Sequence, residues 1–339
     1  MAELNEILGN ERIKEHFITA VHHKKISHAY IMEGDKGSGK KMLAEAFSKI
    51  LQCEGRETTG LVESCGKCES CIQMEYHHPD VIWVSHEKPN VISVGEIREQ
   101  IVNTVEIMPY KGPYKIYIVD EAEKMNAAAQ NAILKTIEEP PEYAVIFLLT
   151  TNRGAFLDTI LSRCILLATR PVPGTAVEKY LVEKCSVSKE EAEFAAGFSL
   201  GNIGKAEAII SSEEFQDLKE LTLSILRYIH EIESYEIADK VKEYKKYKNR
   251  IEDFFDIFLM WFRDIMLLKA DNSVNAEAAK KKIIFKNEYA YLKKQVDKLD
   301  LEAIDYVIGK IHRARVRIKS NVNFDATLEL LIVEARREF

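Results

Sequence analysis

The chain has 339 residues, more than one typical domain holds, so its length predicts two or three domains. With 46% hydrophobic and 30% charged residues it has the composition of an ordinary soluble globular protein, which excludes a fibrous or disordered chain. The net charge of −7 argues against a protein that wraps nucleic acid by its overall field. No apolar run is long enough to span a bilayer and the first residues lack a secretory signal, so we expect a cytoplasmic protein with no membrane partner.

Glycine and proline divide the chain into two regions of different character. All eight prolines lie at or before Pro173, and the only glycine after Gly204 is Gly309. Helices exclude these residues whereas strands and turns need them, so the C-terminal region should be almost entirely helical. We expect an α/β domain over residues 1–170, a small helical domain over 171–211 and a helical domain over 212–339.

Segments typical of strands and helices alternate in the first region. Strands are expected at 30–33, 81–84, 115–120, 145–150 and 164–168, and helices at 7–25, 94–105 and 127–138. Alternation of this kind predicts a parallel sheet covered by helices on both faces. In the second region, long amphipathic helices are expected at 218–232 and 251–268, and the aromatic residues of the latter should form a helix core.

The first predicted strand runs into a glycine-rich loop and then a helix. The loop matches the phosphate-binding pattern G-x-x-x-x-G-K with residues Gly34, Gly37, Gly39 and Lys40. Backbone N–H groups of such a loop, together with the positive end of the following helix, bind phosphate oxygens. The next position should be Ser or Thr, whose hydroxyl ligates Mg²⁺, but it is Lys41, which has only hydrogen-bond donors. The loop therefore predicts a nucleotide-binding fold, while Lys41 argues against ATP–Mg²⁺ chemistry.

Two later strands end in polar residues of the kind that surround a bound nucleotide. The strand 115–120 ends in Asp120 and Glu121, the acids that would hold Mg²⁺ and polarise an attacking water. Thr151 follows the strand 145–150, where it either senses a phosphate or merely begins a turn. The carboxyl ends of parallel strands meet at one edge of a sheet, so these residues are candidates for a nucleotide site.

Four of the six cysteines are clustered with metal-like spacing. Cys53, Cys65, Cys68 and Cys71 follow the pattern C-x11-C-x2-C-x2-C, within a module of about residues 53–76. Four thiolates suit tetrahedral Zn²⁺ in a closed structural site, so the spacing predicts one zinc ion with a structural role. His77 and His78 lie nearby, but the cysteines already supply four ligands.

A further motif, Thr159-Ile160-Leu161-Ser162-Arg163-Cys164, follows a Glu138-Glu139-Pro140-Pro141 stretch. With these motifs, the loop and the inserted cysteines, the chain resembles the bacterial clamp-loader AAA+ ATPases of the DNA polymerase III holoenzyme over nearly its whole length. The resemblance implies an AAA+ parallel-sheet domain with a zinc module, a helical lid and a helical collar. It also implies that Arg163 is an arginine finger, which completes the ATP site of a neighbouring subunit.

Two departures from the family pattern bear on which subunit this is. Lys41 replaces the magnesium-ligating residue of the motor subunits gamma and tau, and Gly204 stands where those motors carry a phosphate-sensing arginine. The resemblance then implies a subunit without ATPase activity of its own, in a hetero-pentamer with gamma/tau and delta. Such a complex would engage the sliding clamp and primer–template DNA. Asp120 and Glu121 are intact, which such a subunit does not need.

Two other readings stay open. The chain could be an ATP-hydrolysing motor of the gamma/tau type, or a zinc-dependent module that binds nucleic acid. A basic cluster near the C-terminus bears on the second reading and comprises Arg313, Arg315, Arg317 and Lys319. These residues alternate with apolar ones, as on the edge of a helix that faces solvent or another subunit.

Overall fold

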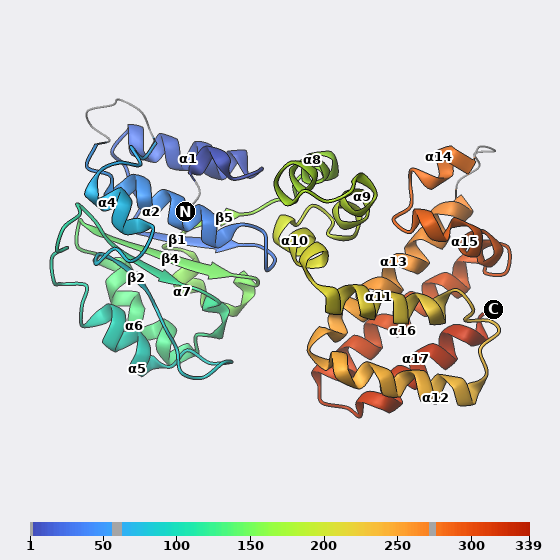
Figure 1. The fold of residues 1–339 in the computed structure, drawn as a ribbon. Coiled ribbons are helices and arrows are strands. Elements are labelled where there is room, and N and C mark those ends of the chain that lie inside the picture. The colour runs from blue at the N-terminus through green and yellow to red at the C-terminus, as the bar shows by residue number, and fades with distance from the viewer. Residues whose placement is uncertain (1–2, 56–62, 271–275) are drawn as a thin grey trace. The chain divides into compact units, whose positions relative to one another are not determined.

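The structure is a computed structural model that describes residues 3–55, 63–270 and 276–339 (Figure 1). The chain divides into two compact units. Unit 1 comprises residues 1–177 and 200–205, and unit 2 comprises residues 178–199 and 206–339. No helix in the described part of the chain is both long and apolar enough to cross a bilayer. The division into three domains stays a prediction.

Unit 1 is built on a five-stranded sheet in which every pairing is parallel. Its strands are β1 (Ala29–Glu33), β2 (Val81–Trp83), β3 (Lys115–Val119), β4 (Ala144–Thr150) and β5 (Ile165–Ala168). They lie in the order β2-β3-β4-β1-β5, so β1 and β4 are central. The parallel α/β sheet predicted from the sequence is confirmed, with strand limits within one residue of those expected.

Helices cover both faces of this sheet (Figure 1). One face packs against α1 (Glu11–His22) and α2 (Lys40–Gln52), where the rings of Phe17 and Phe47 stack at 3.9 Å between centroids. The other face is covered by α5 (Val94–Ile97), η2 (Arg98–Val102), α6 (Ala127–Glu138) and α7 (Asp158–Leu161). Short helices η1 (Leu4–Glu6), α4 (Glu69–Met74), η3 (Ala122–Lys124) and η4 (Arg153–Ala155) complete the unit as described. Both faces of β1, β3 and β4 are buried, which explains why their sequences are almost purely apolar.

Two helices of unit 1 are shorter than the sequence pattern predicts, and in unit 2 the helix expected at 218–232 is instead α11 (Glu213–Leu226). The helix expected at 7–25 begins only at Glu11, because Asn10 adopts a left-handed conformation with φ of 58°. The Asn10 side chain accepts a hydrogen bond from the Arg170 backbone N–H at 2.8 Å and makes no capping bond. The helix expected at 94–105 is α5 followed by the π-helical turn η2. In both places a local backbone change interrupts a continuous helical hydrophobic pattern.

Unit 2 is helical throughout its described residues, which confirms the expectation from glycine and proline. Beginning with α8 (Gly174–Cys185), whose first turn lies in unit 1, the helices that follow are α9 (Lys189–Phe198), α10 (Ile203–Ser211), α11 (Glu213–Leu226), α12 (Ser234–Glu243), η5 (Tyr244–Arg250), α13 (Ile251–Ala270), α14 (Ala276–Lys280), η6 (Lys286–Glu288), α15 (Tyr289–Val296), α16 (Leu301–Lys319) and α17 (Phe324–Arg337). Helix α13 is the centre of this unit and contacts α11, α15 and α16. Its aromatic residues are buried, and Trp261 donates a hydrogen bond to the Gln295 side chain at 2.8 Å.

A fully buried carboxyl group of α13 binds the backbone of residues 284–285, which follow α14 in the chain. Asp264 accepts hydrogen bonds from the backbone N–H groups of Ile284 at 2.8 Å and Phe285 at 2.9 Å, and an ion pair from Arg263 at 2.9 Å. Burial raises the pKa of Asp264 to about 6, although these bonds and the Arg263 charge oppose the shift. The neutral acid is therefore favoured in the folded chain at a pH where the unfolded chain is ionised.

We predict that the wild type loses stability relative to Asp264→Asn as pH rises. A raised pKa in the folded state contributes stability below the unfolded pKa of about 4, and this contribution is lost as pH rises through about 6. Between about pH 5 and about pH 7.5 the difference in free energy of unfolding should fall by roughly 1 kcal/mol. Urea unfolding of the wild type and of Asp264→Asn at several pH values measures this difference. A difference independent of pH would show that the carboxyl stays ionised.

Candidate functional site

The glycine-rich loop connects β1 to α2 at the carboxyl edge of the sheet. Gly37 and Gly39 have φ of +87° and +89°, conformations that residues with a Cβ rarely adopt. The buried Lys40 ammonium donates hydrogen bonds to the carbonyl oxygens of Gly34 at 2.5 Å and Asp35 at 2.8 Å. The Ser38 backbone N–H donates to the Asp35 carbonyl at 3.1 Å. The Lys40 ammonium and the Ser38 N–H, two groups that could face a phosphate, are thus bonded within the loop itself.

The two acids after β3 are each paired with a lysine. The Lys41 ammonium lies 2.6 Å from a carboxylate oxygen of Asp120, so the residue that breaks the loop motif contacts the acid expected to hold magnesium. Glu121 has a left-handed backbone, with φ of 49°, and its carboxylate pairs with Lys124 at 2.5 Å. The structure thus brings Asp120 beside the loop but engages Glu121 elsewhere.

An acid that the sequence reasoning missed lies beside the loop as well. Glu123 accepts a hydrogen bond from the Thr151 hydroxyl at 2.7 Å at the end of β4. Burial alone would raise the pKa of Glu123, but hydrogen bonds led by that from Thr151 outweigh it and lower the pKa. Burial also lowers the pKa of Lys40, an effect that the carboxylates of Glu123 and Asp120 oppose. The sequence held a signal for this acid, because Glu123 is the third acidic residue in the four positions that follow β3, after Asp120 and Glu121.

The start of α10 and the residue before it pack directly on the loop, within unit 1. The Asn202 side-chain amide donates to the Lys36 carbonyl at 2.8 Å, and the Gly204 backbone N–H donates to the Gly37 carbonyl at 3.1 Å. A Cβ on Gly204 would lie 2.8 Å from the Gly37 backbone, closer than real Cβ atoms approach. Gly204 therefore has a packing role here, and the position has no room for the arginine of the motor subunits.

Arg163 lies after α7, at the surface of unit 1. Its Nε is 2.9 Å from a Glu138 carboxylate oxygen, and Nη1 donates to the Thr159 carbonyl at 3.0 Å and the Ser162 hydroxyl at 3.1 Å. The side chains of Arg163 and Glu138 are 40% and 43% exposed. The carboxylate that a structural arginine needs is therefore present, but at the surface, where such a pair contributes only about 0–1 kcal/mol.

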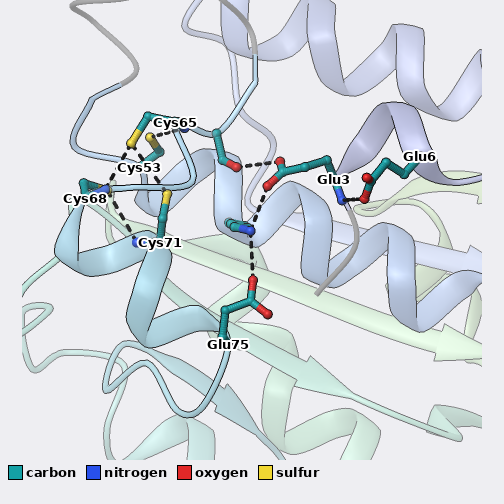
Figure 2. A network of polar contacts seen from close by, with 9 residues as sticks. Glu3, Glu6, Cys53, Cys65, Cys68, Cys71 and Glu75 are labelled. Atoms are coloured by element: carbon teal, nitrogen blue, oxygen red, sulfur yellow. Dashed lines mark hydrogen bonds and ion pairs between the residues drawn. The ribbon is translucent and has the colours of Figure 1, made fainter.

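The four cysteines of the sequence pattern come together in space. Their sulfur atoms all lie within 4.8 Å of one another, as Figure 2 shows for Cys53, Cys65, Cys68 and Cys71. Tetrahedral Zn²⁺ with Zn–S distances of about 2.3 Å places its sulfurs about 3.8 Å apart, so the cluster fits such an ion. Backbone N–H groups of residues 65, 68 and 71 donate to the preceding cysteine sulfurs at 3.2, 3.3 and 3.4 Å. The chain is folded to present these sulfurs to a common centre.

The thiols of this cluster differ in acidity. Backbone hydrogen bonds from Lys67 and Cys68 lower the pKa of Cys65 to about 6, whereas burial raises the pKa of Cys53 and Cys71. Without a cation, the two buried sulfurs are therefore protonated near neutral pH. A bound metal ion would displace these protons, since a coordinating thiol is deprotonated.

A buried lysine fastens the cysteine module to the body of unit 1. Lys49 of α2 pairs with Glu3 at 2.7 Å and with Glu75 at 3.0 Å, and its side chain is only 5% exposed. Figure 2 shows Glu3 and Glu75 on either side of this contact, next to the cysteines. Burial would lower the pKa of Lys49, but the hydrogen bonds to both acids outweigh it and raise the pKa. Glu3 also accepts from the Ser64 hydroxyl at 2.5 Å, which ties the N-terminal segment to the module.

The basic cluster of α16 is neutralised in part within unit 2. Arg315 pairs with Glu252 at 3.1 Å and Asp256 at 2.6 Å, and Lys319 lies 3.3 Å from Glu252. Arg313 and Arg317 are exposed. This arrangement is typical of a helix edge and does not collect the four cations on one surface.

The strand order and the positions of the polar residues define the class of protein. A parallel sheet with a phosphate-binding loop after a central strand, acids after its β3 strand and a polar residue after β4 is an AAA+ module. A family model described as "DNA polymerase III, delta subunit" matches residues 9–173. The chain is 26% identical to DNA polymerase III subunit delta' of Bacillus subtilis, over 98% of this chain and 97% of that relative.

Motor-type relatives match a shorter part of the chain. Identity to DNA polymerase III subunit tau of B. subtilis is 37%, over 47% of this chain and 27% of tau. Among solved structures, a gamma-subunit-related protein of Thermotoga maritima aligns with a TM-score of 0.41 and 18% identity, covering 95% of this chain and 99% of that one. The RuvB branch-migration motor of T. maritima aligns with a TM-score of 0.43 and 16% identity, covering 88% and 91%. The chain is thus similar to the clamp-loader subunits delta' and tau of DNA polymerase III, and to the delta family model over its N-terminal part.

We predict that Gly204→Ala destabilises unit 1. The added methyl group would meet the Gly37 backbone, which cannot move aside as a flexible side chain would. Overpacking of this kind costs about 1–3 kcal/mol. Gly174→Ala is the matched control, because a Cβ there has no neighbour within 4 Å. Thermal unfolding should show a lower midpoint for Gly204→Ala alone; equal midpoints would mean that the contact with the loop is loose.

Proposed function

We propose that this protein is a delta'-type subunit of a DNA polymerase III clamp loader and does not hydrolyse ATP itself. The observation that carries the proposal is the state of the phosphate-binding loop. Its lysine is bonded to two loop carbonyls, its Ser38 N–H to one of them, and the adjacent Asp120 is paired with Lys41. The match to delta' along almost the whole chain supports the same choice. In this role the protein is a fixed member of the loader, beside subunits that do hydrolyse ATP.

An ATP-hydrolysing motor of the gamma/tau type is the second candidate. It is favoured by the intact Asp120 and Glu121 and by the 37% identity to tau over 160 residues. The two candidates differ in one measurable property, ATP turnover by the isolated chain. Turnover that is abolished by Lys40→Ala would establish the motor and overturn the first proposal.

The partners proposed for the chain follow from its relatives. Gamma/tau and delta would be its neighbours in a hetero-pentamer, and the sliding clamp and primer–template DNA would be engaged through that complex. Direct binding of nucleic acid by the zinc module is not favoured, because the chain has a net charge of −7 and part of its basic cluster is paired with acids.

We propose that Arg163 is the arginine finger for a neighbouring motor. Its guanidinium is exposed but held by Glu138, Thr159 and Ser162, so it is oriented without being buried. Glu138 contacts Nε, and Thr159 and Ser162 accept from Nη1, so Nη2 has no hydrogen-bond partner among the described residues. A guanidinium at a ring interface can stabilise the charge of a transferring phosphoryl group, which in related enzymes is worth about 10³–10⁵ in rate.

Arg163→Ala should lower the activity of a reconstituted loader without unfolding this subunit. Only one motor site would face Arg163, so clamp-stimulated ATPase should fall by a fraction and not by the whole factor. The exposed pair with Glu138 predicts a loss in free energy of unfolding of less than about 1 kcal/mol. ATPase and clamp loading are measured after size analysis of the complex.

The matched control is Arg170→Ala, which removes another exposed arginine of unit 1. It should leave turnover and loading unchanged. Normal activity of a fully assembled Arg163→Ala loader would contradict the proposal, and so would a complex that fails to assemble, because that result makes Arg163 structural.

We propose that the cysteine cluster holds one structural Zn²⁺. Cys53, Cys65, Cys68 and Cys71 would be its ligands, and four thiolates leave no open position for chemistry. The ion would join the end of α2 to α4, which are adjacent at the cluster. Metal-binding free energy would then be local folding free energy.

Zinc analysis of the purified chain should return one ion per molecule. Cys68→Ser should lose this stoichiometric zinc and unfold at a lower temperature, since three thiolates bind more weakly than four. Cys185→Ser is the control, because Cys185 lies outside the cluster. A wild type without zinc, or a Cys68→Ser chain that retains it in full, would refute the site.

A further inference from the structure

The contact between Lys41 and Asp120 joins the helix after the loop to the strand that carries the acids. Lys41 is the second residue of α2 and Asp120 follows β3 directly. Their Nζ–Oδ2 distance is 2.6 Å, and the side chains are 60% and 29% exposed. The same ammonium lies 5.9 Å from the centre of the Trp83 ring. One carboxylate oxygen of Asp120 is thus already occupied by a cation that belongs to the chain.

The magnesium ion that the family implies does not fit this arrangement. Mg²⁺ requires oxygen ligands in a near-octahedral shell at about 2.0–2.1 Å. Lys41 offers three N–H donors and no lone pair, and it stands where a hydroxyl ligand would be needed. Its positive charge beside Asp120 would also repel a divalent cation. Glu121 offers no substitute, because it pairs with Lys124.

We infer that Lys41 is a specificity-determining residue that replaces the magnesium ion with a built-in ammonium, and that Asp120 is retained as its counter-ion. The ion pair with Lys41 gives Asp120 a role that does not depend on ATP hydrolysis. The only ligand class that suits the loop is then a metal-free phosphate-bearing anion. Mg²⁺–nucleotide complexes are excluded by charge and ligand type.

The charges around the loop support this inference. The Lys40 ammonium is surrounded by the carboxylates of Glu123, Asp120 and Asp35, and Lys41 adds a second positive charge that contacts Asp120. The chain itself therefore supplies cations for the acids at this edge. The inference deepens the proposed function, on which it rests, because it gives the physical reason why this subunit would not use ATP.

The test is the dependence of ADP affinity on magnesium, measured with a fluorescent ADP analogue on the full chain. The wild type, Lys41→Thr and the double variant Lys41→Thr with Asp120→Asn are titrated in excess Mg²⁺ and in EDTA. Lys135→Thr is the matched control, since it removes an exposed lysine of α6 in the same unit. The quantity compared is the ratio of the dissociation constant in EDTA to that in Mg²⁺.

We expect a ratio of one or less for the wild type and for Lys135→Thr. For Lys41→Thr the ratio should rise to about ten or more, because Asp120 and the new hydroxyl can share a magnesium ion with the phosphates. The double variant should return to a ratio near one. A Lys41→Thr chain with no magnesium-dependent binding overturns the inference, as does a wild type whose affinity already rises with Mg²⁺.

These outcomes are separable from the proposed function. Failure of Lys41→Thr to gain metal dependence, in a chain that still lacks ATPase activity, would refute the role of Lys41 and leave the delta'-type assignment standing. ATP turnover by the wild type would refute both.

Discussion

The geometry of this protein depends on a constraint of its parallel sheet, in which all strands end at the same edge. Because β1 lies between β4 and β5, the loop that follows it is bonded to both neighbours. The Gly34 N–H donates to the Thr150 carbonyl at 3.0 Å, and the Thr169 hydroxyl donates to the Ser38 hydroxyl at 3.0 Å. This edge places the loop beside Asp120, which follows β3, and Thr151, which follows β4, although these residues are far apart in sequence.

The carboxyl edge of such a sheet brings many polar groups together, and those that are shielded from water need a hydrogen-bond or ion-pair partner. The chain supplies partners from within. Lys40 is bonded to two loop carbonyls, Lys41 to Asp120, and Thr151 to Glu123. Asn202 and Gly204 donate to two further loop carbonyls, those of Lys36 and Gly37. Polar groups of the expected phosphate site therefore make internal contacts, which supports the proposal that the fold is kept without ATP hydrolysis.

Much of the fold could be predicted from the sequence, because buried parallel strands are short apolar runs between glycine-rich turns. The cysteine spacing likewise identified residues that the structure places within 4.8 Å of one another. What could not be predicted were contacts between residues distant in the chain. The identity of Lys41 shows that it cannot bind magnesium, but only the packing of α2 beside β3 shows that it pairs with Asp120. The partner of Arg163 is likewise Glu138, 25 positions earlier, at the end of α6.

The limits of two helices were missed for a different reason. Asn10 has a left-handed backbone, and a π-helical turn follows α5, so both interruptions are backbone events inside a continuous hydrophobic pattern. The sequence also could not explain Gly204. A glycine at this position is consistent with the absence of a phosphate-sensing arginine and equally with a close approach of two backbone segments. The structure shows the close backbone approach, at Gly37.

The central claim is that both lysines of the phosphate-binding loop are paired within the chain, so that the chain does not use Mg²⁺–ATP. Its most direct test is the nucleotide content and steady-state ATP hydrolysis of the purified chain alone, compared with Lys40→Ala. The account predicts no stoichiometric nucleotide and no turnover above that of the variant. Bound nucleotide together with turnover that Lys40→Ala abolishes would contradict it.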